Sequence, residues 1–565
     1  MAEQEIKVCQ NCKSSFTIES DDFAFYEKMK VPAPTWCPNC RMARRFSWRN
    51  ERTLHHGKCA ATGVNIITGF APDLGYTIYE RDYWWSDKWD PLACGQEYDD
   101  SKPFFEQFDQ LMHQVPHPSV FNSRTVNCDY VQHTGEYKDG YLVSASWEGE
   151  NVAYASRCNN AKDCMDMFEV FYCTLGYEDI SCVKLYNTHF SFRSQNCNDS
   201  WFLFDCKSCS NCFGCWNLRN KSYYIFNKPY SKEEYKRKMA ELDMGSFKNL
   251  EDAKVKFQDI KKQALHKFAT LINAPESTGD NLENVKNCKT CFGFWGDVRD
   301  CKYCMNGGVK SSDMYDGYGV GANAELVYEA FDSGVQGSRQ MFVGIVYGCN
   351  SVTYCYNCTG SSNLFGCIGL RNKQYCILNK QYTKEEYEKI VAKIKGKMLD
   401  DGEYGEFFPT KISPFGYNET VAQDYFPLTK EEALVQGYKW RDPSAPSYKS
   451  TIKAHNLPDH IKDVNDGVLK EIIECADCSR PYRIVKRELE FLKHLNIALP
   501  RKCFECRHQN RFHHVNFPRL FNRSCMCNKS HQDHIGQCPN KFETSYAPDR
   551  SEAVYCEQCY QAEVV

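Results

Sequence analysis

The sequence predicts a multidomain, mainly β protein in which zinc ribbons at both termini flank two duplicated β-solenoid-like repeat domains with capping helices. Three features lead to this fold class. Pairs of C-x2-C motifs occur at both ends of the chain with the same spacing. Between them, small polar residues recur at short regular intervals, and one segment of the middle is duplicated.

The composition is that of a globular protein. The chain has 565 residues, of which 25% are charged and 42% hydrophobic, and its formal charge of -4 argues against a wholly basic nucleic-acid coat. No apolar run approaches the roughly 18 residues of a membrane helix. Because Met1 to Lys7 lack the apolar core of a signal peptide, we expect the 34 cysteines to be reduced, in a cytoplasmic protein.

The first terminal module, residues 1–58, has a copy at residues 466–524. Both contain two C-x2-C pairs with 24 residues between them, and a further cysteine follows each module at the same distance. Two such pairs can supply four thiolates to one tetrahedral Zn²⁺, as in zinc ribbons and treble clefs. We therefore predict two closed zinc sites, formed by Cys9, Cys12, Cys37 and Cys40 and by Cys475, Cys478, Cys503 and Cys506.

A further zinc ribbon is predicted at residues 525–565. Cys556 and Cys559 form one half of its site, and the other half must come from Cys525, Cys527 and Cys538. One of Cys525 and Cys527 is then spare, and His531 and His534 are alternative ligands. This module has about ten more residues after Cys525 than its N-terminal counterpart.

That counterpart, residues 59–125, is expected to be a degenerate ribbon followed by a helix. Of its four ligand positions only Cys59 is a cysteine, and the others are Thr62, Glu80 and Tyr83. The helix places Phe104, Phe105, Phe108 and Leu111 on one stripe, which is typical of a core-facing helix. We predict no metal here, and thus about three zinc ions per chain.

The middle of the chain is predicted to form two β-solenoid domains, residues 126–230 and 285–395, joined by a helical linker, residues 231–284. A repeat of 12 or 13 residues with many Gly, Asn and Asp turns is typical of stacked coils, and a β-sandwich is the alternative. Residues 211–235 and 363–387 share 17 of 25 residues. Each copy continues into a helix with a capping box, expected to cap the open end of its solenoid.

The cysteines of the middle are predicted to be structural and metal-free. Residues i and i+3 of a strand face opposite sides, so the thiols of a C-x2-C pair converge only where a corner intervenes. Buried cysteine is also a common small hydrophobic residue. The best exception, where a metal or iron–sulfur cluster is the alternative, is the set Cys288, Cys291, Cys301 and Cys304.

Basic residues follow the second knuckle of both terminal modules, with aromatic residues among them. Such segments suit phosphate contact and base stacking, and the alternative is a solvated helix face or a protein partner. The predicted nucleic-acid contacts are Arg41, Arg44, Arg45, Arg49, Arg507, Arg511 and Arg523. Residues 396–465 are expected to be an extended linker that crosses the surface, with a hinge at Asp442–Pro446.

Several segments are similar to a known group of proteins. They are Phe426-Pro-Leu-Thr-Lys-Glu-Glu-Ala, Gly437-Tyr-Lys-Trp-Arg-Asp, Leu499-Pro-Arg-Lys-Cys and Thr544-Ser-Tyr-Ala-Pro-Asp-Arg. Together with Tyr555-Cys-Glu-Gln-Cys-Tyr they resemble uncharacterised cysteine-rich bacterial zinc-ribbon proteins. The resemblance implies zinc binding and no particular activity.

The function expected from these features is that of a non-catalytic zinc-binding scaffold or adaptor that contacts nucleic acid or a nucleoprotein complex. A protein–protein scaffold without nucleic acid is one alternative, and an iron–sulfur or redox protein is another. A carbohydrate-active enzyme is a further alternative, since Asp297, Asp300, Asp313 and Asp316 could supply paired carboxylates. No nucleophile elbow, P-loop or H-E-x-x-H motif is present in the sequence.

Overall fold

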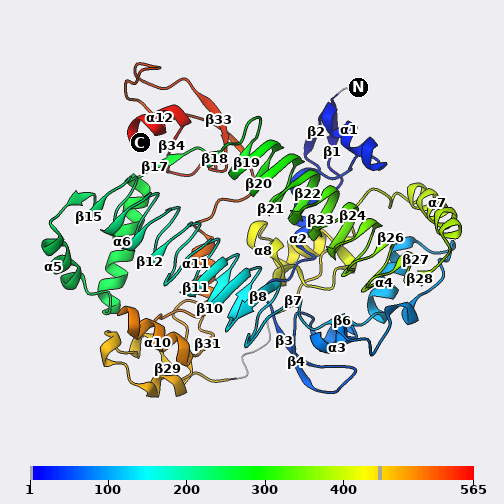
Figure 1. The fold of residues 1–565 in the computed structure, drawn as a ribbon, viewed down its shortest axis with the longest axis horizontal. Helices are drawn as coiled ribbons and strands as arrows, with labels where there is room; N and C mark the ends of the chain where they lie inside the picture. The colour runs from blue at the N-terminus through cyan, green and yellow to red at the C-terminus, as the bar shows by residue number, and fades with distance from the viewer. Residues whose placement is uncertain (1–3, 443–447, 565) are drawn as a thin grey trace.

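Two stacks of short parallel strands form the centre of the molecule, and small modules of hairpins and helices pack against them (Figure 1). The structure is a computed structural model, and it describes residues 4–442 and 448–564. It is mainly β, as predicted. The predicted hinge lies outside the described residues except for Asp442. No helix within the described ranges is long and apolar enough to cross a membrane.

The first stack covers residues 122–229 and has a period of 12 residues. Trp147 pairs in parallel with Asn159, and Asn198 with Ser210. Isolated parallel bridges continue this register between its two sheets, and the antiparallel pair β15–β16 ends it. Its strands are β7 (Asn122–Ser123), β8 (Thr134–Lys138), β9 (Tyr141–Ser144), β10 (Trp147–Ser156), β11 (Asn159–Met165), β12 (Tyr186–His189), β13 (Asn198–Trp201), β14 (Ser210–Phe213), β15 (Ser222–Ile225) and β16 (Lys228–Pro229).

The second stack covers residues 271–381 and begins before the predicted boundary at residue 285. Ser312 pairs with Glu325, 13 residues on, whereas Ser362 pairs with Gln374, 12 residues on. This parallel register is the one expected of a β-solenoid, and a sandwich requires antiparallel pairing. Its strands are β18 (Leu271–Ile272), β19 (Gly279–Lys289), β20 (Cys291–Lys302), β21 (Met305–Gly308), β22 (Ser311–Ala322), β23 (Glu325–Val335), β24 (Ser338–Tyr347), β25 (Asn350–Thr353), β26 (Ser362–Phe365), β27 (Gln374–Ile377) and β28 (Lys380–Gln381).

A corner with positive φ recurs at almost every third residue of the stacks, as at Asp163 (φ 51°) and Asp166 (φ 56°). Asn, Asp and Gly tolerate this left-handed region best, which explains why small polar residues mark the repeat. One residue between successive corners points inward, and Cys164, Met167 and Val170 are fully buried in this way. Residues i and i+3 therefore face the same interior, because a corner does intervene between them.

Helices close the two stacks at equivalent positions. α5 (Lys232–Leu242) and α7 (Lys384–Asp400) begin with the two predicted capping boxes. Tyr235 of α5 packs on Tyr223, and Tyr387 of α7 packs on Tyr375, in both cases with ring centroids 5.8 Å apart. α6 (Phe247–Gln263) lies along the first stack, where Phe257 contacts Phe202.

Four small modules, two at each end of the chain, share one plan of a hairpin followed by a helix. Residues 4–46 contain β1 (Glu5–Val8), β2 (Ser15–Ile18), α1 (Ser20–Met29) and α2 (Pro38–Phe46). Residues 55–118 contain β3 (His55–Lys58), β4 (Asn65–Thr68), β5 (Ile78–Tyr79), α3 (Arg81–Trp85), α4 (Phe104–Gln114) and β6 (His117–Pro118). The C-terminal modules contain β29 (Ile452–Lys453), β30 (Ile473–Glu474), β31 (Pro481–Tyr482), α10 (Lys486–Leu495), α11 (Phe504–Phe512), β32 (Phe521–Ser524), β33 (Lys541–Thr544), β34 (Ala553–Tyr555) and α12 (Glu557–Val564).

Each pair of modules docks on the stack that is remote from it in sequence. α2 lies on β22 and β23 of the second stack, and α4 packs Phe104 on Phe365 of the same stack (Figure 1). The C-terminal modules lie on the first stack, where Arg511 of α11 bonds Asp166 and Tyr560 of α12 bonds Arg219. β17 (Leu265–Lys267), which follows the first stack, pairs with β34. The two halves of the molecule are thus assembled crosswise.

Matching buried ion pairs join both halves. Arg41 donates to Asp316 (2.8 Å) and Arg507 lies 3.2 Å from Asp166, each from the residue after the last cysteine of its module. One helical turn further on, Arg511 bonds Asp166 at 2.7 Å, and the equivalent arginine of α2, Arg45, lies 3.3 Å from Asp316. None of these side chains is more than 5% exposed.

Asp166 and Asp316 are equivalent positions of the duplicated stacks. Four coils separate each of them from the glycine of a duplicated Phe-Gly-Cys segment. The corners in between are Glu178, Phe190 and Phe202 before Gly214, and Glu329, Phe342 and Tyr354 before Gly366. The docking contact was therefore duplicated together with the two elements that it joins.

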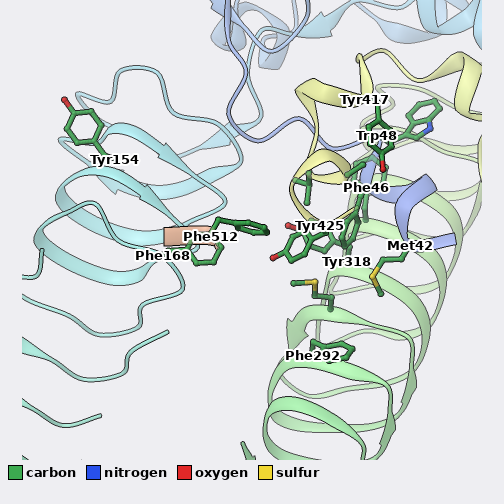
Figure 2. Packing of buried hydrophobic residues seen from close by; sticks show 14 of the residues in the cluster. Met42, Phe46, Trp48, Tyr154, Phe168, Phe292, Tyr318, Tyr417, Tyr425 and Phe512 are labelled. Carbon is green, nitrogen blue, oxygen red and sulfur yellow. The ribbon is translucent and has the colours of Figure 1, made fainter. Parts of the chain in front are cut away.

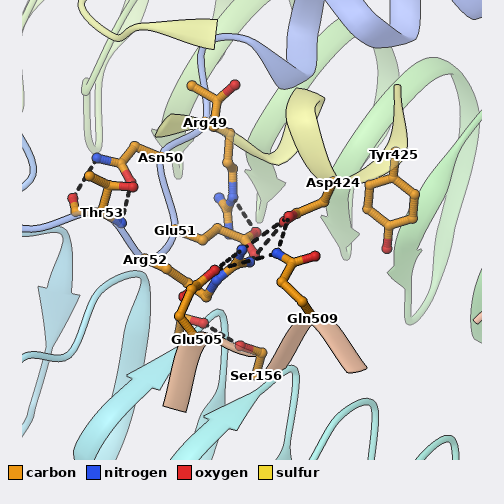
Figure 3. Close-up of polar contacts among 12 residues, drawn as sticks. Arg49, Asn50, Glu51, Arg52, Thr53, Ser156, Asp424, Tyr425, Glu505 and Gln509 are labelled. Carbon is orange, nitrogen blue, oxygen red and sulfur yellow. Dashed lines mark hydrogen bonds and ion pairs between the residues drawn. The ribbon is translucent and has the colours of Figure 1, made fainter. Parts of the chain in front are cut away.

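The predicted surface linker is a correction, because residues 404–441 are largely buried between the two halves. Tyr425 of α8 (Val421–Tyr425) packs on Phe46 of α2 (5.5 Å) and on Phe512 of α11 (4.9 Å), which are equivalent residues of the twin modules (Figure 2). Asp424 accepts hydrogen bonds from Arg52 (2.8 Å) and Gln509 (3.1 Å), as Figure 3 shows. α9 (Lys430–Val435) follows.

The two stacks contact each other directly and run in opposite directions. His133 of the first stack bonds Asp332 of the second (2.6 Å), and Arg157 bonds Tyr318 (2.5 Å). Further along, Phe171 packs on Trp295 and Arg193 pairs with Asp280. Residue numbers rise in one stack as they fall in the other, which is the arrangement expected of two halves related by an approximate two-fold axis.

The buried ion pairs give a first prediction. Asp316→Asn removes a buried charge from two arginines and is expected to lower the free energy of unfolding by about 3–5 kcal/mol. The matched control is Asp313→Asn at a corner of similar φ (53° against 57°). Its ion pair with Lys28 is partly exposed, so a loss below about 1 kcal/mol is expected. Urea unfolding followed by circular dichroism measures both, and equal losses would contradict the docking role.

His117 gives a prediction for acid. It is fully buried, bonds the Met112 carbonyl oxygen (2.7 Å), and burial lowers its pKa to about 4. Because the unfolded chain takes up the proton near pH 6.5, this contribution to stability is complete above that pH and is lost as the pH falls toward 4. His117→Gln should therefore lose about 3 kcal/mol less than wild type across this range. Urea midpoints against pH measure it, and the exposed control His56→Gln should keep the wild-type slope.

Candidate metal centres

The first centre is built by a hairpin and a helix, the plan of a treble clef. Cys9 and Cys12 lie in the turn between β1 and β2. Cys37 is the N-cap of α2 and Cys40 lies in its first turn, with Pro38 at the first helical position. A helix N-terminus stabilises nearby thiolates through its dipole and free N–H groups. The four sulfur atoms lie within 4.8 Å of one another and could hold a metal ion.

The second centre repeats this geometry. Cys475 and Cys478 lie between β30 and β31, Cys503 is the N-cap of α11, and Cys506 lies in its first turn. Its four sulfurs also lie within 4.8 Å of one another. In both centres the first cysteine accepts a hydrogen bond from the backbone N–H of the third, at 3.2 Å in each. Such bonds to sulfur orient the ligands and favour the thiolate.

The spacing of the sulfurs fits a tetrahedral ion. Four sulfurs at about 2.3 Å from a central ion lie about 3.8 Å apart. The Cys12–Cys37 and Cys478–Cys503 distances are 3.7 Å, and the Cys475–Cys506 distance is 3.8 Å. A disulfide would require about 2.05 Å. All four positions are taken by protein thiols, so these are closed centres with no place for a substrate.

Protonation of the thiols also suits metal binding. Burial opposes ionisation of Cys475, but backbone N–H groups of Cys478, Cys503 and Asp477 outweigh it and lower the pKa to about 7. In the stacks the opposite holds, since burial raises the pKa of Cys158, Cys349 and Cys376 to about 12. The terminal thiols are therefore the more readily ionised ones.

The third centre lies in the last module and settles which cysteine is spare. Cys525, Cys538, Cys556 and Cys559 bring their sulfurs within 4.8 Å of one another, and Cys538 lies 3.9 Å from Cys556. The Cys556 N–H donates to Cys525 (3.3 Å), as in the first two centres. Cys527 stands outside this set and groups instead with His531, His534 and Cys559.

The degenerate module keeps the geometry without the ligands. The N–H of Glu80 donates to Cys59 at 3.2 Å, in the place of the corresponding bond in the other three modules. Thr62, Glu80 and Tyr83 occupy the other ligand positions, and among the described residues no group of metal ligands forms around Cys59. Buried Trp84, which donates to the Pro116 carbonyl oxygen, lies in α3, the helix of this module.

The cysteines inside the stacks form no comparable set within the described part of the chain. Their thiols donate to the backbone, typically to the carbonyl oxygen two residues earlier, as from Cys206 to Phe204 and from Cys301 to Arg299. Cys288 differs, because the thiols of Cys291 and Cys301 donate to it and lower its pKa to about 4. Its own thiol lies 3.5 Å from the Lys286 carbonyl oxygen.

The arginines predicted to contact nucleic acid are the main correction. Six of the seven are at most 5% exposed and are committed to carboxylates or carbonyl groups within the protein: Arg41, Arg44, Arg45, Arg49, Arg507 and Arg511. Arg44 pairs with Glu329 (3.1 Å) and Glu406 (2.8 Å), and Arg49 pairs with Asp332 (2.5 Å). These six side chains are not available at the surface. Arg523 remains half-buried and donates to the Ala547 carbonyl oxygen.

The acidic partners of these arginines were not recognised in the sequence. Asp166, Asp316, Glu329 and Asp332 occupy corners of the stacks, where turn chemistry alone accounts for Asp. The one available signal was the spacing of Arg41 with Arg45 and Arg507 with Arg511, because residues four apart share one face of a helix.

Comparisons of the sequence with models of known protein families and with curated proteins give no match. The assignment of the terminal modules therefore depends on their cysteine geometry.

The centres predict how metal content responds to mutation. Cys12→Ser removes one of four thiolates and should leave one fewer metal ion per chain than wild type. Cys206→Ser changes a buried cysteine of the first stack that bonds only backbone, so its metal content should equal that of wild type. Elemental analysis of the purified full chain measures both. Equal losses in the two variants, or none in either, would contradict the assignment.

Proposed function

We propose that the protein is a non-catalytic scaffold or adaptor in which zinc ions shape the terminal modules. One observation carries this proposal. The helix that begins at each of the first two centres, α2 or α11, is the helix whose arginines dock the module on its stack. The metal ion therefore serves assembly of the two halves.

Zinc is the ion that the ligands favour. Four thiolates in a tetrahedral set are typical of structural zinc, and the match of the sulfur spacing to Zn–S bonds of about 2.3 Å supports it. An iron–sulfur cluster also takes four thiolates. Zinc is favoured because these ligands belong to treble-clef modules in which one ion replaces much of a hydrophobic core. The free thiols throughout the described chain suit a reducing compartment, which supports a cytoplasmic location.

The carboxylates considered for catalysis have structural roles. Asp297, Asp300 and Asp313 are corner residues with φ of 62°, 55° and 53°. Asp300 accepts from Asn287 in a ladder of corner side chains (2.8 Å), and Asp316 is consumed by Arg41. These contacts favour the scaffold over a carbohydrate-active enzyme.

Burial of the arginines favours a protein partner over nucleic acid. Phosphate contact needs cations at the surface, and the predicted ones are paired inside the molecule. Of the residues proposed for such contact, only Arg523 keeps part of its surface. We therefore place the protein–protein scaffold first and contact with nucleic acid or a nucleoprotein complex second.

Filter binding of single-stranded RNA and duplex DNA in rising KCl tests this order. We expect weak binding to wild type that Arg523→Ala leaves within about twofold. A charge reversal of the exposed residue Lys541, Lys541→Glu, serves as a control for general surface charge. Tight binding that falls steeply with salt and is lost in Arg523→Ala would reverse the order and make nucleic acid the partner.

A further inference from the structure

The hairpin of the last module is longer than its counterpart, and the extra residues carry metal-ligand side chains. In the degenerate module the turn between β3 and β4 spans residues 59–64, whereas residues 525–540 separate β32 from β33. The longer turn contains Cys527, His531 and His534 in addition to Cys525 and Cys538. The third centre uses only the last two of these.

The remaining three side chains converge on one point together with Cys559. The sulfur and nitrogen atoms of Cys527, His531, His534 and Cys559 lie within 4.8 Å of one another. Cys527 lies 3.2 Å from Nε2 of His531, and Cys559 lies 3.1 Å from Nε2 of His534. Tetrahedral zinc with sulfur and nitrogen ligands separates them by about 3.6 Å, so small side-chain shifts complete the geometry.

The protonation of His534 is fixed by its second nitrogen. Nδ1 lies 2.9 Å from the carbonyl oxygen of Gly536, which can only accept a hydrogen bond. Nδ1 therefore carries the proton, and Nε2 directs its lone pair toward Cys559. A backbone acceptor of this kind is the usual second-shell partner of a metal-bound histidine. His531 is held nearby, since its backbone N–H donates to the carbonyl oxygen of His534 (2.9 Å).

We propose that the last module holds two metal ions that share the thiolate of Cys559. Cys525, Cys538 and Cys556 complete the first set, and Cys527, His531 and His534 complete the second. This inference rests on the proposed zinc binding and adds a fourth ion to the chain. Two thiolates and two imidazoles in a tetrahedron suit Zn²⁺.

The charges favour the pair. One Zn²⁺ with four thiolates has a net charge of about -2, and a second Zn²⁺ with the Cys527 thiolate and two neutral imidazoles brings the total to about -1. Glu563 lies 3.5 Å from Nε2 of His531 and also pairs with Lys529. Metal binding by His531 leaves that carboxylate to the lysine.

Elemental analysis of the full chain tests the inference. Wild type should contain about four zinc ions, and the double variant His531→Ala/His534→Ala one fewer. The matched control changes two exposed histidines, His494→Ala/His513→Ala, and should keep the wild-type content. Equal zinc in the double variant and in wild type would overturn the second ion. A wild type without zinc would instead overturn the proposed function.

Cobalt substitution tests the shared ligand. A bridging thiolate couples the spins of two Co²⁺ ions, so the EPR intensity per cobalt should rise in His531→Ala/His534→Ala. The same variant should lose the visible absorption band of the mixed sulfur–nitrogen site. Unchanged intensity per cobalt together with loss of one ion would contradict sharing of Cys559 and would assign its sulfur to a single metal.

Discussion

Buried ion pairs between the helices of the terminal modules and the corners of the stacks hold the two halves of this molecule together. Arg41 and Arg45 meet Asp316, and Arg507 and Arg511 meet Asp166. Taking such charges out of water costs several kcal/mol per ion, and breaking one pair leaves the other charge unpaired. Their main effect is therefore on position, since a module docked one coil away would bury arginines without partners.

The crosswise assembly follows from this constraint. Each pair of modules is adjacent in sequence to one stack and docks on the other, so the chain must return past both stacks. The segment expected to be a surface linker makes this return and becomes part of the core. Tyr425 contacts Phe46 and Phe512, and Asp424 bonds Arg52 and Gln509. One short helix thus joins the equivalent helices of the two halves.

The four modules show how one plan tolerates different metal content. All four keep a bond from a backbone N–H to the first cysteine. In the degenerate module this bond persists with three ligand positions changed. In the last module a longer hairpin adds Cys527, His531 and His534 beside the four-cysteine set. The hairpin turn is where residues can be added with least effect on the docked helix.

Local features of this protein were determined by the sequence alone. The spacing of Cys9, Cys12, Cys37 and Cys40 predicted a converging set, the capping residues Ser231 and Thr383 predicted two helix starts, and the repeat predicted the strand register. Each is encoded in residues close together in the chain, where turn and capping chemistry act. Only the tertiary structure decided that the arginines are buried, because Arg41 and Asp316 are 275 residues apart. It also decided that Cys559 faces two ligand sets, since no local pattern specifies which distant groups share a thiol.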